Sequence, residues 1–337
     1  MRAWQIQDRF SLESLRLVER AEDTPGPGQV AVRVRAVSLN HRDLLTVEGT
    51  YNPKQPLPLV PVSDGAGEVE TVGPDVTRPR PGDRVAGLFA PRWIAGEPTR
   101  ERLRSTLGGP LDGMLAERVV LAAEGVAPFP EHLSFEEAAC LPCAALTAWS
   151  AVAGPRGMTA GETLLVLGTG GVSLFALQLG RLLGARVLVT SSSDAKLERA
   201  RELGAAGVVN YRTRPDWDEA VRERTGGRGV DRVVEVGGAG TLARSLRAVR
   251  TGGTVCLVGN LSGLEARLNL AHVFMRAVEL RGVLVGSREG FEAMSRAIAL
   301  HEMRPVVDRV FAFDDAPAAF RHLESGAHFG KVVVRVG

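Results

Sequence analysis

One stretch of the chain, between Thr163 and Thr190, constrains the fold more than any other. An apolar run at 164–167 leads into the glycine turn Gly168-Thr-Gly170-Gly171-Val172-Ser173, and a helix-like segment and a second apolar run follow. In such a strand, turn, helix and strand, the glycines let the backbone approach a pyrophosphate, and the helix N-terminus faces the anion. Serine stands where the third glycine is usual, so a tight turn serving packing or another nucleotide-like ligand is the alternative. The stretch predicts half of a dinucleotide site.

The same alternation of apolar and helix-like segments continues to about residue 286. Six strands are predicted at 164–167, 186–190, 208–209, 232–236, 254–258 and 279–285. Helices are predicted between them at 173–183, 195–203, 215–224, 240–249 and near 270–277. Strict alternation of this kind is typical of a doubly wound parallel sheet, so the prediction for this half is an α/β fold with a six-stranded Rossmann sheet.

The first part of the chain has a different pattern. Short β runs at 31–37, 67–72, 84–88 and 115–121 lie between Pro/Gly clusters and predict a compact, mostly antiparallel barrel, with a loop or short solvated helix at 91–110. Ser134-Phe-Glu-Glu137 is a capping box that opens a helix. A helix at 291–301 and a β run at 331–336 are expected to return to the first domain. The predicted domains are therefore 1–130 with 287–337, and 131–286.

Composition excludes several functional classes. The formal net charge is +2, from 41 basic and 39 acidic residues without a basic stripe, which argues against nucleic-acid binding. No window reaches the roughly 18 uninterrupted apolar residues of a membrane span, and the N-terminus does not resemble a signal peptide. The three cysteines are too few for a disulfide framework. We expect a cytoplasmic protein that acts on a small molecule.

The strand after the glycine turn bears on the choice of cofactor. The acid that reads the ribose in NAD sites, about 20 residues past the turn, would fall at Ser191, where there is no carboxylate. A small hydroxyl leaves room for a 2′-phosphate, and Lys196 supplies positive charge, so NADP is the preferred cofactor. Asp194 is interpreted as the cap of a helix that begins at Ala195. If 191–193 is simply a polar turn, the choice between NAD and NADP stays open.

Motifs along nearly the whole chain resemble the medium-chain dehydrogenase/reductase superfamily. They are Asn40-His41-Arg42-Asp43 ahead of Gly49-Thr-Tyr51, the run 61–73, Pro81-Gly-Asp-Arg-Val85, Cys143-Ala-Ala-Leu-Thr147-Ala-Trp149, the glycine turn, Gly226-Gly-Arg-Gly-Val-Asp231, and Gly330-Lys331. Within it, the chain is similar to the zinc-independent branch of quinone oxidoreductases and enoyl reductases. The resemblance implies a GroES-like catalytic domain and NADPH as cofactor. The implied cofactor contacts are Asn40, Thr147, Gly168, Gly170, Gly171, Val172, Ser191, Lys196, Tyr211 and Asn260.

The metal-binding positions of zinc-dependent relatives are altered here. Those relatives hold catalytic zinc with Cys, His and Cys, where this sequence has Asn40, Ser63 and Cys143, and 88–116 lacks the four cysteines of a structural zinc site. Asparagine and serine are poor zinc ligands, so no metal is expected. Two alternatives stay open, a site built from His41, Asp64 and Cys143, and a redox pair in Cys140-Leu-Pro-Cys143.

Without zinc to polarise a carbonyl, the substrate that accepts the hydride must already be activated. The protein must also supply an O–H or N–H donor for the negative charge that develops as the hydride arrives. Tyr51 matches the tyrosine that protonates or orients the substrate in enoyl thioester reductases; the alternative is an aromatic wall of a cleft. Asn40 is interpreted as holding the nicotinamide ribose or the substrate oxygen, or else as a loop-capping amide. Arg42 stands where zinc enzymes carry a proton-relaying hydroxyl residue.

The hypothesis is hydride transfer from NADPH to a quinone or α,β-unsaturated carbonyl substrate. An NAD(P)-dependent alcohol dehydrogenase, or a nucleotide-binding relative without efficient catalysis, is the alternative. The resemblance also implies a homodimer or homotetramer, formed through the edge strand at 279–285.

Overall fold

The computed structural model describes all residues from Met1 to Gly337. The chain divides into two compact units: unit 1 comprises Met1–Leu146 and Val285–Gly337, and unit 2 comprises Thr147–Leu284. No helix has both the length and the apolar character needed to cross a membrane.

The units differ from the predicted domains by the segment 131–146 and by residues 285–286, both of which belong to unit 1. Phe135 packs edge-on against Phe129, with ring centroids 5.9 Å apart. The backbone N–H of Cys143 donates to the Asp64 carboxylate over 3.0 Å. These contacts hold the segment to unit 1, although its helical pattern continues into the α/β half.

Unit 1 is built on a seven-stranded sheet with the order β14-β15-β3-β4-β5-β7, in which β6 also pairs with β3. A separate hairpin joins β1 to β2. The strands are β1 (Arg2–Ile6), β2 (Leu15–Glu19), β3 (Gln29–Leu39), β4 (Asp64–Val72), β5 (Arg84–Gly87), β6 (Arg118–Ala122), β7 (Val126–Pro128), β14 (Val307–Ala312) and β15 (Lys331–Arg335). As expected, the end of the chain returns to the first domain: β15 runs antiparallel to β3, with Val332 opposite Leu39.

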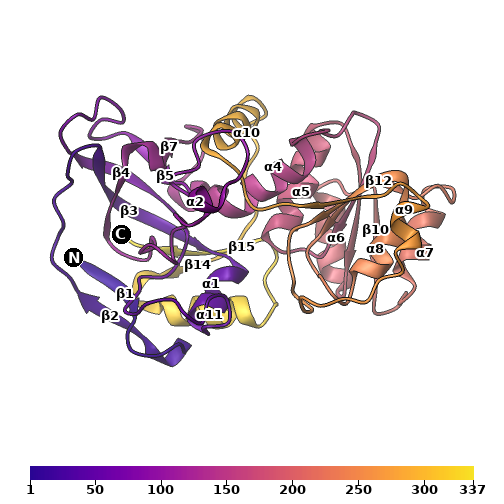
Figure 1. Cartoon of the computed structure of the whole chain (residues 1–337), viewed down its shortest axis with the longest axis horizontal. Coiled ribbons are helices and arrows are strands. Elements are labelled where there is room, and N and C mark those ends of the chain that lie inside the picture. The colour runs from indigo at the N-terminus through magenta and orange to yellow at the C-terminus, as the bar shows by residue number, and fades with distance from the viewer. The chain divides into compact units, whose positions relative to one another are not determined.

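Short helices cover this sheet. They are α1 (His41–Val47), α2 (Arg100–Leu103), α3 (Phe135–Ala138), α10 (Arg288–Leu300) and α11 (Ala316–Glu324), with 3-10 turns at Leu12–Ser14, Ala123–Gly125 and Phe313–Asp315 and a π turn at Leu141–Ala145. The helix α11 lies beside α1 (Figure 1). The capping box at Ser134 and Glu137 is confirmed. Sequence reasoning missed α1, whose start is marked by Asp43 accepting a hydrogen bond from the Asn40 backbone N–H over 2.8 Å.

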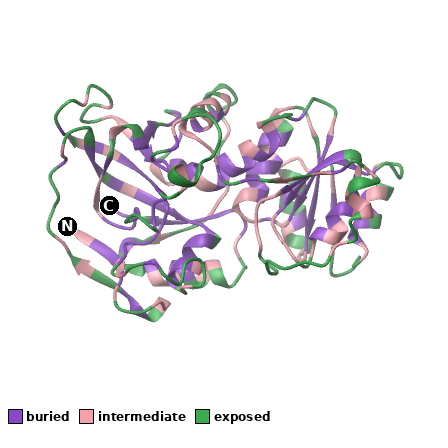
Figure 2. Ribbon diagram, viewed as in Figure 1, coloured by how far each residue is buried: buried purple, intermediate pink, exposed green.

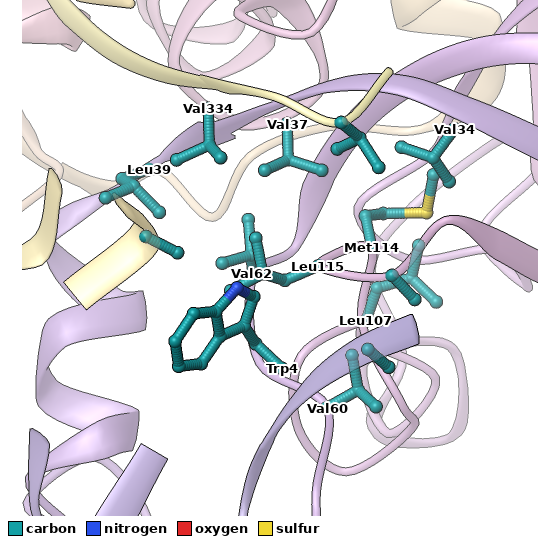
Figure 3. Packing of buried hydrophobic residues seen from close by; sticks show 14 of the residues in the cluster. Trp4, Val34, Val37, Leu39, Val60, Val62, Leu107, Met114, Leu115 and Val334 are labelled. Carbon is teal, nitrogen blue, oxygen red and sulfur yellow. The ribbon is translucent and has the colours of Figure 1, made fainter. Parts of the chain in front are cut away.

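The core of unit 1 lies where the N-terminal hairpin, the central strands and the C-terminal strand meet. Figure 3 shows Trp4 beneath the aliphatic side chains of β3 and β15, among them Leu39, Val37 and Val334. The indole N–H of Trp4 donates to the Phe313 carbonyl over 2.8 Å. The indole is therefore buried without leaving its one donor unsatisfied.

Unit 2 is a six-stranded, wholly parallel sheet with the order β10-β9-β8-β11-β12-β13. Its strands are β8 (Thr163–Leu167), β9 (Arg186–Ser191), β10 (Gly207–Asn210), β11 (Val230–Glu235), β12 (Val249–Leu257) and β13 (Glu279–Gly282). Its helices are α4 (Leu146–Ala153), α5 (Gly171–Leu182), α6 (Asp194–Glu202), α7 (Trp217–Glu223), α8 (Leu242–Ala248) and α9 (Ala271–Phe274). The central strands are buried along their length, whereas the surrounding helices carry exposed residues (Figure 2).

This arrangement confirms the predicted α/β class and the doubly wound sheet. The strand order reverses at β8, which has β9 on one side and β11 on the other. In open α/β sheets, ligands bind at the carboxyl ends of the strands where the order reverses. The glycine turn follows β8 directly, so the fold brings it to this switch point.

Candidate functional site

The glycine turn of unit 2 has the geometry of an anion cradle. Gly168 has φ +77°, a left-handed conformation that glycine adopts without strain. Gly170 is the N-cap of the twelve-residue helix α5 and makes no side-chain capping bond, so the first N–H groups of the helix face a ligand position without a competing cap. Val172 lies in the first turn of this helix.

Ser173 explains how the turn manages without its third glycine. Its hydroxyl donates to the Leu167 carbonyl over 2.7 Å. The bond joins the first turn of α5 to the end of β8, so the serine itself fixes the close approach of helix and strand that a glycine otherwise permits.

At the end of β9, Ser191 is buried, and its hydroxyl accepts a bond from the Ser193 N–H over 3.4 Å. The predicted cap at Asp194 is wrong: Ser193 caps α6 by accepting from the Lys196 N–H, also over 3.4 Å. Asp194 is the first helical residue, and its carboxylate accepts from the Asn210 side-chain amide over 2.7 Å. That bond explains why the shorter serine side chain provides the cap. Lys196 itself lies in the first turn of α6, close in sequence to Ser191.

The remaining cofactor candidates of unit 2 are distributed over neighbouring elements. The Tyr211 N–H donates to the Ser191 carbonyl over 3.0 Å, which places Tyr211 beside the end of β9, with its side chain 42% exposed. Asn260 follows the end of β12, and Thr147 is buried in the first turn of α4. The structure thus brings the turn, Ser191 and Tyr211 to the carboxyl ends of adjacent strands, which is the edge where open α/β sheets bind ligands. Asn260 and Thr147 lie on other elements of the unit.

Unit 1 contains a buried polar network centred on a lysine. Lys331, in β15, is 3% exposed, and its ammonium donates to the Asn40 side-chain oxygen over 2.6 Å and to the Leu39 carbonyl over 2.7 Å. Because the ammonium only donates, the oxygen of the Asn40 amide must face Lys331 and its NH₂ group must face away. The NH₂ group lies 3.4 Å from the Ser63 hydroxyl.

The network continues through two buried carboxylates. The Ser63 hydroxyl donates to one oxygen of Asp64 over 2.9 Å, and the Cys143 N–H donates to the other over 3.0 Å. The Ser63 N–H donates to Asp43 over 3.1 Å. Burial raises the pKa of Asp64 to about 6, although the positive charge of Lys331 opposes this rise. Burial also raises the pKa of Asp43.

These residues do not fit a zinc ion. The Asn40 oxygen already binds an ammonium, and the Ser63 hydroxyl donates its proton to Asp64. Burial and the neighbouring Asp64 carboxylate raise the pKa of Cys143, which favours the thiol over the thiolate that zinc binds. No three His, Cys, Asp or Glu side chains of the chain are grouped to hold a metal, so His41, Asp64 and Cys143 do not form the alternative site.

The redox alternative is also not supported. Cys140 and Cys143 are not joined in a disulfide. Burial raises the pKa of Cys140 to about 11, and its sulfur donates to the Glu136 carbonyl over 3.2 Å. Reactive cysteines have a lowered pKa, so this pair has the properties of structural thiols.

Tyr51 follows α1, the helix that begins at the network residue Asn40. Its side chain is 46% exposed, and its hydroxyl has no hydrogen-bond partner within the protein. Its N–H donates to the Leu45 carbonyl over 3.1 Å, which ties the segment after α1 to that helix. The hydroxyl is therefore free to donate to a ligand.

Sequence reasoning treated Lys331 only as part of a family motif and Asp64 as a ligand of the alternative metal site, and it did not foresee their place in this network. The signal for Lys331 was its place directly before an apolar β run, Val332-Val-Val, in a chain with only two other lysines. Lysine is almost never fully buried unless it is paired. A lysine at this position therefore needs a hydrogen-bond acceptor for its ammonium, and the Asn40 side-chain oxygen is that acceptor.

Comparisons with known proteins agree with both units. Residues 26–131 match the family described as alcohol dehydrogenase GroES-like domain, and residues 171–300 match the family described as zinc-binding dehydrogenase. A zinc-type alcohol dehydrogenase-like protein of Schizosaccharomyces pombe is 42% identical over 92% of this chain and 91% of its own length. An acryloyl-coenzyme A reductase of Metallosphaera sedula is 28% identical over 94% of this chain and 95% of its own length.

Two solved structures are also similar along nearly the full length. An NAD-dependent alcohol dehydrogenase superposes with a TM-score of 0.92 at 38% identity, covering 100% of both chains. A crotonyl-CoA carboxylase/reductase in complex with NADP superposes with a TM-score of 0.88 at 26% identity, covering 100% of this chain and 94% of the other. The similar proteins thus differ in named substrate and cofactor.

The raised pKa of Asp64 predicts a defined pH dependence of stability. Folding raises this pKa from 3.8 to about 6, so its contribution to stability is complete below pH 3.8 and is lost as the pH rises through about 6. Asp64→Asn cannot ionise. We expect its stability relative to the natural protein to increase by about 2.5 kcal/mol between about pH 4 and about pH 7.5.

Chemical unfolding of both proteins at the two pH values measures this difference. Asp75→Asn is the matched control, because Asp75 is exposed and has φ +64°, a conformation that asparagine tolerates. A stability difference for Asp64→Asn that does not change with pH would contradict the prediction.

Proposed function

Because the chain belongs to the medium-chain dehydrogenase/reductase superfamily, we propose that it is an NADPH-dependent reductase of quinones or α,β-unsaturated carbonyl compounds that works without zinc. Membership makes the chain an oxidoreductase. The proposal that the enzyme works without zinc rests on one observation: the Lys331 ammonium bonds to the Asn40 oxygen, at a position where zinc-dependent relatives have a ligand. An acceptor that is not polarised by a metal must be activated by its own conjugation.

The cofactor half of the proposal is supported by unit 2. The N-terminus of α5 and the glycines at 168, 170 and 171 would hold the pyrophosphate. Ser191 and Lys196 would lie at the 2′-phosphate, where a small hydroxyl and a cation suit an added negative charge. When bound, NADPH supplies a hydride to the conjugated carbon of the substrate.

The substrate half of the proposal assigns two roles in unit 1. Tyr51 donates its hydroxyl proton to the substrate, and this donation balances the negative charge that hydride addition leaves on the conjugated carbonyl. Asn40, held by Lys331 on one side and by Ser63 on the other, orients the ribose or the substrate oxygen. The similarity to an acryloyl-coenzyme A reductase and to a crotonyl-CoA carboxylase/reductase supports a conjugated thioester as one member of the substrate class.

A zinc-containing alcohol dehydrogenase is the second candidate. The names of the 42% identical relative and of the 38% identical structure favour it. It requires a thiolate at Cys143 and at least two further ligands, and the raised pKa of this thiol and the bonds of Asn40 and Ser63 argue against both. A nucleotide-binding protein without efficient catalysis is distinguished by tight NADPH binding without turnover.

Oxidation of NADPH with a panel of acceptors tests the reductase proposal. We expect turnover with quinones, enones and 2-enoyl thioesters, little with saturated aldehydes, and no loss of rate after treatment with a strong zinc chelator. Metal analysis of the purified protein is the independent measurement. Stoichiometric zinc together with chelator-sensitive alcohol oxidation would establish the second candidate instead.

For Tyr51, we expect Tyr51→Phe to lower kcat by about 10²-fold, since a positioned general acid contributes on the order of 10²–10⁴-fold. The dissociation constant for NADPH should change little, because only the phenolic oxygen is removed. Single-turnover kinetics separate the two quantities. Tyr211→Phe is the comparison: Tyr211, the only other tyrosine of the chain, is an implied cofactor contact, so its substitution should affect NADPH binding rather than kcat. An unchanged kcat in Tyr51→Phe would remove Tyr51 from the chemistry.

For the cofactor, we expect Ser191→Asp to raise the dissociation constant for NADPH at least about tenfold, equivalent to ~1.4 kcal/mol. The introduced carboxylate repels the 2′-phosphate and accepts hydrogen bonds from a 2′-hydroxyl, so NADH binding should be kept or improved. Ser191→Ala, which adds no charge, is the control. Titration of both nucleotides by protein fluorescence gives the constants. An equal weakening of both nucleotides in Ser191→Asp would contradict a 2′-phosphate position at Ser191.

We also propose that the chain forms a homodimer or homotetramer. The strand β13 is at the edge of the unit 2 sheet, and large exposed apolar side chains are concentrated in the segment around it: Leu261, Leu264, Leu270, Phe274, Met275, Leu280 and Leu284. An edge strand with unpaired N–H and C=O groups is a template for pairing with a second chain.

A further inference from the structure

Arg42, the second residue of α1, is buried and is not used by the function proposed above. The side chain is only 8% exposed, so its charge needs partners inside unit 1. One terminal nitrogen donates to the Leu107 carbonyl over 2.6 Å. The other donates to the Gly109 carbonyl over 3.1 Å and lies 3.5 Å from the Gly108 carbonyl. The guanidinium therefore holds three consecutive carbonyls of the loop that follows α2.

The same guanidinium packs against two aromatic rings. Its central carbon lies 4.8 Å from the centroid of the Tyr51 ring and 5.1 Å from that of Phe89. Phe89 is buried and Tyr51 is half-exposed. Cation–π attraction is strongest where the cation has lost its water, as here. The guanidinium thus supports the ring of Tyr51, although the hydroxyl of Tyr51 has no hydrogen-bond partner.

The position of Arg42 carries a cost in stability. Its Nε is buried and has no hydrogen-bond partner in the protein. An unsatisfied buried donor is unfavourable, and a shorter or apolar side chain would not have it. Only a planar, forked group reaches the carbonyls and also presents a flat face to the rings, which a lysine ammonium cannot do.

From these contacts we propose that Arg42 is a positioning residue: it fixes the Tyr51 ring against the 107–109 loop, and thereby directs the hydroxyl toward the substrate. This inference rests on the proton-donor role proposed for Tyr51. The loop and the tyrosine are far apart in the sequence, and the guanidinium joins them directly. Arg42 acts through Tyr51 and does not itself contact the reacting atoms.

Unit 1 contains a second arginine of the same kind, which provides a matched control. Arg84 donates to the Glu131 and Leu133 carbonyls over 3.1 and 2.6 Å. Its guanidinium carbon lies 4.7 Å from the ring centroids of both Phe129 and Phe135. Arg84→Met therefore removes the same types of interaction from unit 1 without touching Tyr51.

The first experiment measures the tyrosine without any catalysis. The chain has only two tyrosines, so protein labelled with 3-fluorotyrosine gives two ¹⁹F resonances, which Tyr211→Phe assigns. We expect Arg42→Met to shift the Tyr51 resonance toward the position of a solvated fluorotyrosine, and Arg84→Met to leave it unchanged. If Arg42→Met leaves the Tyr51 resonance in place, the proposal is wrong.

The second experiment measures whether this positioning matters for turnover. We expect Arg42→Met to lower kcat at least about tenfold, equivalent to ~1.4 kcal/mol in the barrier, with the dissociation constant for NADPH unchanged. Arg42→Lys should not restore the rate, because it keeps the charge but not the fork. In the double variant with Tyr51→Phe, the two losses should not add, since both act through one hydroxyl. Additive losses, or an equal loss in Arg84→Met, would overturn the proposal.

The two experiments distinguish failure of this inference from failure of the proposed function. A displaced ¹⁹F resonance with an unchanged kcat in Tyr51→Phe would mean that Arg42 holds a tyrosine that is not the proton donor, which overturns the catalytic part of the proposal. An unmoved resonance with an active Tyr51 would overturn only the role of Arg42. Thermal unfolding of Arg42→Met and Arg84→Met identifies any loss caused by misfolding.

Discussion

A lysine ammonium cannot be buried without acceptors, and this constraint organises the interior of unit 1 around Lys331. The ammonium bonds to the ends of two different elements, the last carbonyl of β3 and the Asn40 side chain at the start of α1. Asn40 and Ser63 are in turn held by Asp43, and Ser63 and Cys143 by Asp64. Removing one member of such a network leaves a neighbour buried and unpaired, which costs more than the lost bond itself. The strands, α1 and the π turn are therefore bound into one arrangement by a few polar groups.

The same network limits the chemistry of the site. A metal ion and an ammonium compete for the same oxygen lone pairs, and the shortest contact of Asn40 is to the ammonium. The raised pKa of Asp64 and of Cys143 reflects burial, which outweighs the opposing positive charge of Lys331. Such a site can hold and orient a polar group. Because this donor set does not suit a zinc ion, which would polarise an unactivated carbonyl, we propose a conjugated acceptor.

Two arginines show how an aromatic ring can be held without being fully buried. Arg84 lies against two phenylalanines, whereas Arg42 lies against one phenylalanine and the half-exposed Tyr51. The first arrangement connects the segment before α3 to the sheet and leaves no polar group at the rings. In the second, a phenolic hydroxyl remains free above a rigid base, which is a requirement for a proton donor that must point in one direction.

The alternation of apolar and helical segments in the sequence determined the parallel sheet, its six strands and the position of the glycine turn, because period, turn residues and strand length are local properties. The capping box at Ser134 was readable for the same reason. The helix α1 was missed because it is only seven residues long and because its N-cap, Asn40, and its N3 residue, Asp43, were interpreted only as parts of a family motif and of the site. Only the tertiary structure decided that the Lys331 ammonium bonds to Asn40, which lies nearly three hundred residues earlier in the chain. It also decided that the Arg42 guanidinium packs against the Tyr51 ring. The same holds for the cap of α6, which is Ser193 rather than Asp194. These depend on which distant groups compete for the same donors and acceptors, and that competition is settled only when the chain has folded.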